Sequence, residues 1–212
     1  MKLTYLSIFT INCTLLINCF TAFAAQETKV QNILLTKHCI TTPQIWSLEA
    51  PDQFISYSDL RKKEGSSVFA QGNSIIIEGI VTDKNCIPLA GASIKIWQKN
   101  LGQKKAKTDI TFYTGLNVSD TLGRFSFYTI MPLPEHDDEP MLYINISHPE
   151  IIDFETVMLF SKDGINSPSL KNLTKLERNL LVAKCRNCND TKAVPIYDFR
   201  IITDGKPPYK DY

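Results

Sequence analysis

The densest group of potentially reactive side chains is the run Glu135-His136-Asp137-Asp138-Glu139, with Tyr143 four residues further on. Carboxylate, imidazole and phenolate groups all serve as ligands for metal ions in proteins. Glu135, His136 and Tyr143 are therefore candidate metal ligands. A charge run in a loop is more often only hydrated, so a solvated loop is the plainer interpretation of the same residues.

Histidine is scarce, which limits any site built on several imidazoles. The chain has three histidines, His38, His136 and His148, far apart in the sequence. His148 precedes Pro149, and we expect it to cap a turn, because a histidine without partners is rarely a metal ligand. The Gly-x-Ser-x-Gly motif of nucleophilic hydrolases is absent from the sequence.

Four cysteines follow the N-terminal apolar segment, namely Cys39, Cys86, Cys185 and Cys188. The last two form a C-x-x-C motif, but a thioredoxin-like redox site needs a βαβ pattern that the sequence does not show. A zinc site would need Cys39 and Cys86 to complete it. Two structural disulfides are the simplest expectation for an exported chain, and four cysteines allow three pairings.

The N-terminus has the pattern of a secretory signal peptide. Lys2 is the only charge before Glu27, and the apolar stretch ends in Ala22-Phe23-Ala24. An uncleaved anchor is less favoured, because polar residues interrupt the stretch. We expect removal of residues 1–24, a secreted or periplasmic location, and no stable membrane span after cleavage.

Composition narrows the function classes. The 212 residues are 43% hydrophobic, and Lys+Arg 23 against Asp+Glu 22 gives a net charge of +1. This is ordinary globular composition. Nucleic-acid-binding domains usually carry a basic excess, so we expect no nucleic-acid partner.

The elements that would position these residues are mostly strands. Alternating or β-rich stretches occupy residues 74–81, 92–97, 124–130, 141–147, 156–160 and 196–202. Residues 173–183 have the spacing of one short helix. Short strands without βαβ alternation predict an all-β protein, an antiparallel β-sandwich. We expect an irregular N-terminal arm over residues 25–73 and the sandwich domain over residues 74–212.

Four segments carry a family resemblance: residues 78–100, 119–132, 155–168 and 197–202. They include Ile96-Trp97-Gln98, Thr129-Ile130-Met131-Pro132 and Val157-Met158-Leu159-Phe160, in that order. The region from about 74 to 204 resembles the intradiol ring-cleavage dioxygenases, non-haem Fe(III) enzymes that open catechols between the two hydroxyls. The resemblance implies a β-sandwich of that type, an Fe(3+) cofactor if the chain is active, and a small aromatic, catechol-like ligand.

The positions that the resemblance assigns to the iron ligands carry other residues. The family binds Fe(III) with two Tyr and two His. Lys105 or a neighbour stands at the first Tyr position, and Glu135 at the second. The His-x-His pair corresponds to Tyr143 and Asn145, or to Met141 and Tyr143 in the other register, and strand alternation keeps either pair on one face. A family Gln corresponds to Val157, and a family Arg to Glu139 or Pro140.

Two functional hypotheses remain from the sequence. The first is an exported dioxygenase that holds iron through non-standard ligands, with Glu135, His136 and Tyr143 as the candidates. The second is a catalytically inactive relative without a cofactor, which acts as an extracytoplasmic binding or interaction module.

Overall fold

The computed structural model describes residues 39–46, 50–51, 54, 56–61, 69–70, 72–99, 112–134, 138–160 and 167–204. The expected signal peptide lies outside these residues, as do Lys105, Glu135 and His136. In the described part of the chain, no helix is long and apolar enough to cross a membrane. The boundaries expected at residues 24 and 73 stay predictions.

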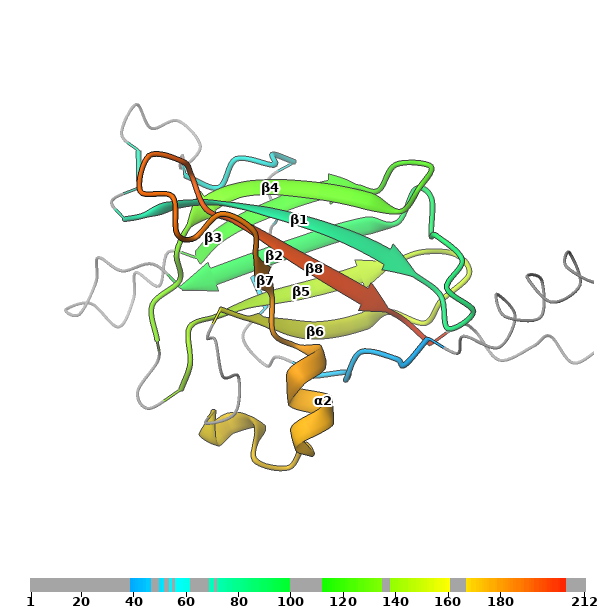
Figure 1. Ribbon diagram of the computed structural model, residues 1–212. Helices are drawn as coiled ribbons and strands as arrows, with labels where there is room; N and C mark the ends of the chain where they lie inside the picture. The colour runs from blue at the N-terminus through cyan, green and yellow to red at the C-terminus, as the bar shows by residue number, and fades with distance from the viewer. Residues whose placement is uncertain are drawn as a thin grey trace, which may run out of the picture. The chain divides into compact units, whose positions relative to one another are not determined.

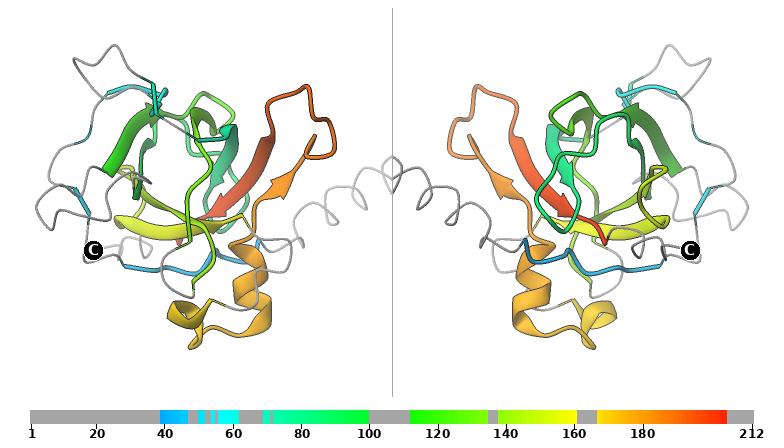
Figure 2. Two further views of the ribbon diagram at one scale, coloured as in Figure 1. Left: turned by 90° about the vertical axis from the view of Figure 1, so that its left-hand side faces the viewer. Right: turned by 90° about the vertical axis from the view of Figure 1, so that its right-hand side faces the viewer.

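Two four-stranded sheets pack face to face, which confirms the predicted β-sandwich (Figures 1 and 2). The first sheet has the order β4-β1-β8-β7 and the second β3-β2-β5-β6. The strands are β1 (Ser74–Thr82), β2 (Ser93–Lys99), β3 (Phe112–Val118), β4 (Arg124–Ile130), β5 (Met141–Ser147), β6 (Phe154–Leu159), β7 (Lys184–Cys185) and β8 (Ile196–Ile202). Neighbouring strands are antiparallel except β1 and β8, which pair in parallel with Ile76 opposite Ile196.

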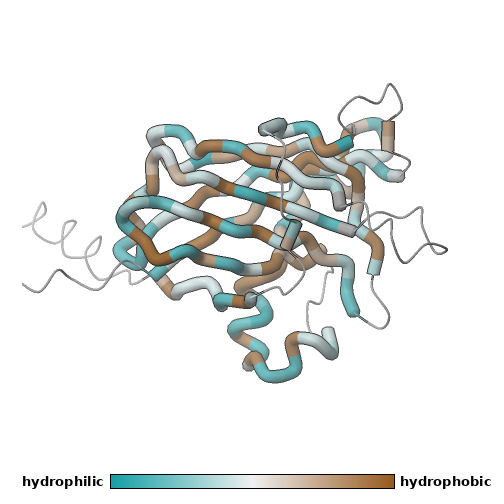
Figure 3. Tube along the Cα trace, turned by 180° about the vertical axis from the view of Figure 1, so that it is seen from behind, coloured by the Kyte–Doolittle hydropathy of each residue, from teal (hydrophilic) through white to brown (hydrophobic). Residues whose placement is uncertain are grey.

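Strand alternation builds the core between the sheets. Ile75 and Ile77 of β1 and Ile144 and Ile146 of β5 have no exposed surface. Figure 3 shows hydrophobic and hydrophilic residues alternating along several stretches of the sandwich. Burial of each such side chain contributes about 1.5–3 kcal/mol, so this inward-facing set holds the two sheets together.

Strand β3 was not expected from the sequence, and Gly115 at its centre explains both the omission and the strand's role. A Cβ at Gly115 would lie 2.6 Å from Leu60 Cδ1 and 2.9 Å from the Tyr57 carbonyl oxygen. A glycine inside a strand often marks a close approach of another backbone. Here it lets residues 57–60 lie against β3, where the Leu116 amide donates to the Tyr57 carbonyl.

The residues before β1 cover both edges of the sandwich. At one edge, the Tyr128 amide of β4 donates to Ser58 and the Leu60 amide donates back to Tyr128. At the other edge, the Thr42 amide donates to Ile202 of β8, and the Ile45 amide donates to Glu155 of β6. Open strand edges would otherwise template aggregation, so these contacts protect both sheets.

Arg61 fastens residues 57–61 to the first sheet. Its guanidinium donates to both carboxylate oxygens of Asp59, at 2.9 and 2.7 Å, and lies 3.4 Å from the centroid of the Tyr128 ring. The combination of a bidentate ion pair with a cation–π contact fixes the guanidinium in one orientation.

The expected helix is present as α2 (Lys175–Leu180), preceded by the 3₁₀ turn η1 (Pro168–Leu170). Thr174 and Glu177 form a reciprocal capping box at its start. The helix is shorter than the predicted range, because residues 181–183 pair with β6 instead. The Leu159 amide donates to Leu181, and the Ala183 amide donates to Leu159.

The cysteines form two disulfides, Cys39–Cys86 and Cys185–Cys188. This pairing excludes the alternative in which all four cysteines bind one zinc ion. His148 caps a turn as expected: its Nε2 lies 3.1 Å from the Ala90 carbonyl, and its Nδ1 accepts from the Glu150 amide.

The turn between β3 and β4 is built around the Asp120 carboxylate. Oδ1 accepts from the amides of Leu122 and Arg124, at 2.9 and 2.8 Å, and Oδ2 accepts from Arg124 Nε at 2.8 Å. These bonds, the one from the Arg124 amide foremost, hold the pKa of the Asp120 carboxyl below its usual value.

We expect Gly79→Ala to destabilise the sandwich, because the new Cβ would lie 2.1 Å from Phe125 Cζ. Overpacking a filled core costs about 1–3 kcal/mol. Urea unfolding of Gly79→Ala, Phe125→Leu and the double variant measures the effect. The double variant should lose less stability than the two single variants lose together, by about 0.5 kcal/mol or more. Strict additivity would contradict the steric explanation.

The Asp120 turn should make stability depend on pH. A carboxyl whose folded pKa is lowered stabilises the fold above its unfolded pKa, about 4, and this contribution disappears as the pH falls through the folded value. The difference in unfolding midpoint between the wild type and Asp120→Asn should therefore be largest near neutral pH and shrink in acid. A difference that stays constant across the acid range would mean that the charge of Asp120 is not what stabilises the turn.

Candidate functional site

Tyr143 and Asn145 lie on one face of β5, as the alternation predicted. Leu142, Ile144 and Ile146 point into the core and have no exposed surface, whereas Tyr143 and Asn145 are half-buried. Both therefore project from the outer face of the β3-β2-β5-β6 sheet, and so does Met141, at the other possible ligand position.

Aromatic packing surrounds Tyr143. It lies opposite Trp97 of β2 and Val157 of β6 in the sheet register. Its ring stacks on the Trp97 indole, with centroids 5.5 Å apart and planes 13° from parallel. Phe54 meets the same indole edge-on at 5.7 Å, and Trp97 is 1% exposed.

An apolar cluster covers the rest of this outer face. Met141, Val157 and Leu159 pack with Leu170 of η1 and Leu181 after α2, and all five are buried. Partly buried side chains flank them: Ile45, Tyr143, Leu173 and Val182. Val157, which the resemblance aligns with a family Gln, is 1% exposed. We call these nine residues the outer cluster.

The described residues at the iron-ligand positions do not fit a ferric ion. Fe(III) prefers hard anionic oxygen and imidazole ligands, and Tyr143 supplies one phenol beside an amide or a thioether. The Trp97 Nε1–H is buried without an acceptor in the described part, but it is a donor and cannot ligate a metal. Within the described ranges, no group of three or more His, Cys, Asp or Glu side chains could hold a metal.

The sequence supports the same conclusion. His148 is held in its turn, which leaves His38 and His136 as the other histidines of the chain. A His-x-His pair on β5 is therefore impossible. Of the predicted metal ligands, the structure places Tyr143 in the outer cluster, whereas Glu135 and His136 lie outside the described residues.

One member of the acidic run has a structural partner. Asp138 Oδ1 accepts from the Ser167 hydroxyl at 2.8 Å and from the Ser169 amide at 3.0 Å. These bonds tie the segment before β5 to the start of η1, and thereby help to hold Leu170 in the outer cluster.

A groove of about 800 Å³ crosses the outer face of the other sheet. Its lining comes from β4, β1, β8 and β7, together with the end of β3, the end of α2 and Ile40. Ile40, Ile80 and Val118 are 55%, 41% and 55% exposed, which is unusual for large apolar side chains. We call this surface the β1–β8 groove.

Most charges in the β1–β8 groove are already paired. Arg186 donates to Glu78 at 2.5 Å and to Asp198 at 2.8 Å, and Arg124 is held by Asp120. These bonds raise the pKa of the Arg186 guanidinium, the one to Glu78 foremost, so it stays charged.

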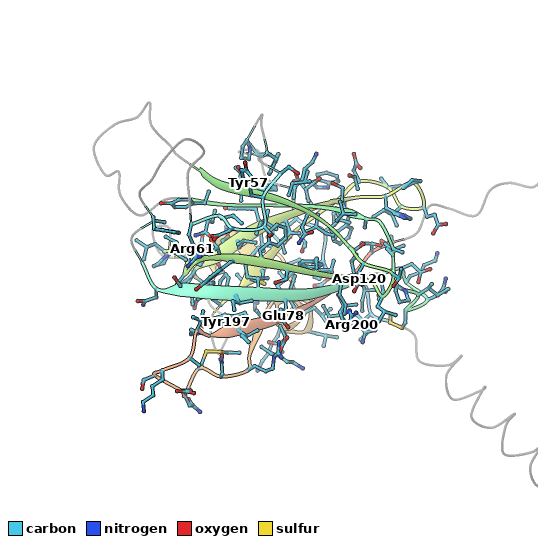
Figure 4. All side chains as sticks on the ribbon, turned by 90° about the horizontal axis from the view of Figure 1, so that it is seen from above. Tyr57, Arg61, Glu78, Asp120, Tyr197 and Arg200 are labelled. Atoms are coloured by element: carbon cyan, nitrogen blue, oxygen red, sulfur yellow. A yellow bond between two sulfur atoms is a disulfide. The ribbon has the colours of Figure 1, made fainter. Side chains whose placement is uncertain are left out.

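Arg200 and Lys184 are the other two cations in this groove. Among the described residues, neither has a carboxylate within ion-pair distance. Arg200 Nη2 donates to Cys39 Sγ at 3.6 Å. Figure 4 labels Arg200 together with Glu78 and Asp120. An apolar floor beside an unpaired guanidinium can bind a small apolar body that carries an anionic group.

Sequence reasoning missed the β1–β8 groove, because its residues come from segments as far apart as Ile40 and Arg200. One sequence signal could have pointed to it. Ile80 breaks the alternation of β1 by placing a large apolar side chain on the face that Glu78 shares.

Comparisons with known proteins agree with the fold. A family model described as "Dioxygenase" matches residues 49–140, and so ends just before β5. A Rickettsia bellii protein named "Putative dioxygenase" is 26% identical over 176 residues, covering 76% of this chain and 82% of its own length.

Two solved structures extend the comparison. The intradiol ring-cleavage dioxygenase of Tetranychus urticae superposes with a TM-score of 0.64 at 12% identity, over 78% of this chain and 95% of that one. The 3-chlorocatechol 1,2-dioxygenase of Rhodococcus opacus 1CP gives 0.59 at 14% identity, over 84% and 77%. In sequence and in fold, this chain resembles the intradiol ring-cleavage dioxygenase family.

Proposed function

We propose that this chain is an exported, non-catalytic relative of the intradiol dioxygenases that binds a small aromatic ligand. The observation that carries the proposal is the outer cluster. At the positions where the resemblance places iron ligands and their neighbours, Met141 and Val157 are buried among leucines. Apolar side chains there stabilise the fold and offer a ferric ion no hard ligand.

Export is proposed from the N-terminal pattern and agrees with the cysteine chemistry. Disulfides form and persist in oxidising compartments, and both pairs in this chain are oxidised.

The β1–β8 groove is the binding surface that we propose. Ile80 and Val118 offer an aromatic ring an apolar floor, and Arg200 offers an anionic substituent a guanidinium. An aromatic carboxylate has both features. The intradiol substrates in the names of the structural relatives are likewise small aromatics.

A second candidate is an active dioxygenase with altered ligands. The half-buried phenol of Tyr143 and the names of the relatives favour it. In that case Tyr143, with Glu135 and His136, would hold Fe(3+), which supplies the oxidising chemistry when bound, while Trp97 would fix the orientation of the Tyr143 ring by stacking.

Metal analysis separates the two candidates. We expect the exported chain to purify colourless, with well under one iron per chain, and to consume no oxygen with catechol after iron is supplied. About one tightly bound iron, with a tyrosinate-to-iron absorption band that Tyr143→Phe abolishes, would overturn the non-catalytic proposal and establish the second candidate.

Ligand titration tests the groove. By calorimetry, benzoate should bind more tightly than phenol, because only benzoate is anionic at neutral pH. Arg200→Gln should weaken benzoate binding about tenfold or more, the usual value of a hydrogen bond between charged groups. Lys171→Gln is the control, since Lys171 is an exposed cation that does not line the groove, and it should bind benzoate like the wild type. Equal affinity in wild type and Arg200→Gln would contradict the assignment.

A further inference from the structure

The C-x-x-C disulfide lies on the surface, beside a second groove. Cys185 and Cys188 are both exposed, at the end of β7 and in the loop that follows it. The groove has a volume of about 960 Å³ and is lined by both cysteines together with Phe160, Ala183 and Tyr197. Tyr197, which lines the same groove, is labelled in Figure 4.

The loop between β7 and β8 is held by other bonds. The Asn187 side chain accepts from the Ile196 amide at 2.8 Å and donates to the Val194 carbonyl at 2.9 Å. The Arg186 amide donates to Ile196 at 2.9 Å, and its guanidinium holds both carboxylate oxygens of Asp198. These contacts do not pass through sulfur, so the loop can keep its shape when the disulfide opens.

The disulfide also constrains the unfolded chain little. It joins residues three apart, whereas Cys39 and Cys86 are 47 apart and tie the residues before β1 to the β1–β2 turn. In the chain-entropy account, stabilisation grows with the length of the closed loop. The Cys39–Cys86 bond is therefore expected to stabilise the fold more than the Cys185–Cys188 bond.

Tyr197 distinguishes the two sulfur atoms. Its hydroxyl lies 3.5 Å from Cys188 Sγ and is the donor, because a disulfide sulfur carries no proton. Burial raises the pKa of Tyr197, so the hydroxyl stays protonated at neutral pH. The same hydroxyl can donate to a Cys188 thiolate, which makes Cys188 the better leaving group when the disulfide is attacked.

We propose that Cys185 and Cys188 form a redox-active pair that oxidises a dithiol of a partner protein. A partner thiolate attacks the exposed Cys185 Sγ, the S–S bond breaks, and its electron pair goes to Cys188 as a thiolate held by Tyr197. The second partner thiolate attacks the partner sulfur of this mixed disulfide and releases Cys185. The partner becomes a disulfide, and this chain gains two electrons and two protons. Ligand binding in the β1–β8 groove is not required.

The test uses the full exported chain and dithiothreitol as the dithiol. Trapping with an alkylating reagent and peptide mass analysis should show that Cys185–Cys188 opens about tenfold or more faster than Cys39–Cys86, with one dithiothreitol oxidised per chain at early times. Circular dichroism and the melting temperature should stay nearly unchanged at that stage. Opening of Cys39–Cys86 first, or unfolding when the C-x-x-C pair opens, would overturn the proposal.

Two variants locate the chemistry. Cys185→Ser/Cys188→Ser should fold and abolish the fast phase of dithiothreitol oxidation, and a fast phase that persists would contradict the assignment. Tyr197→Phe should slow the fast phase about threefold or more, because the Cys188 thiolate loses its donor. Tyr128→Phe is the matched control and should leave the rate unchanged, because Tyr128 lies two strands away on β4, with its ring under the Arg61 guanidinium.

Discussion

The burial of Met141, Val157 and Leu159 beneath Leu170 and Leu181 is the contact on which the rest of this structure depends. It covers the outer face of β5 and β6 and fixes η1 and α2 against the sheet. Next to this contact, residues 181–183 pair with the edge of β6, and the chain then continues into β7 of the other sheet. A metal site needs polar ligands and access for substrate, whereas a close-packed apolar cluster excludes both. The same residues cannot serve the two purposes, and in this chain they serve packing.

The residues before β1 stabilise the edges of the two sheets, as the outer cluster stabilises the outer face of β5 and β6. They pair with β4 and β3 on one side and with β8 and β6 on the other, so that each sheet has a backbone partner where it would otherwise end. Gly115 makes one of these contacts possible, and the Cys39–Cys86 disulfide anchors the other near the end of β8. Sealing the edges leaves the outer faces of the strands as the surfaces through which this protein can meet other molecules.

The β4-β1-β8-β7 sheet carries both features for which we propose activity, the groove on its outer face and the disulfide at its β7 edge. Arg186 links them, since it lies between the two cysteines in sequence while its guanidinium holds Glu78 and Asp198 at the β1–β8 groove. Because Arg186 pairs with both carboxylates, Arg200 has no carboxylate partner among the residues that the structure describes. Because Arg186 also holds the loop after β7, that loop has contacts that do not depend on the disulfide. A sandwich core tolerates many different outer faces, so one fold can carry unrelated functions.

The sequence alone determined the sandwich, the short helix before β7 and the family resemblance, because the alternation of apolar residues and the placement of turn residues are local properties. It also determined that the family's His-x-His pair is absent, since that depends only on residue identity. Strand β3 escaped prediction because Gly115 lacks β-propensity. The glycine is needed there because the backbone of residues 57–60, distant in sequence, lies against the strand. Only the tertiary structure decided that Val157 and Met141 are buried, that Ile40 and Arg200 share a groove, and that Tyr197 faces Cys188. These are contacts between residues distant in sequence, and their existence depends on which strands become neighbours.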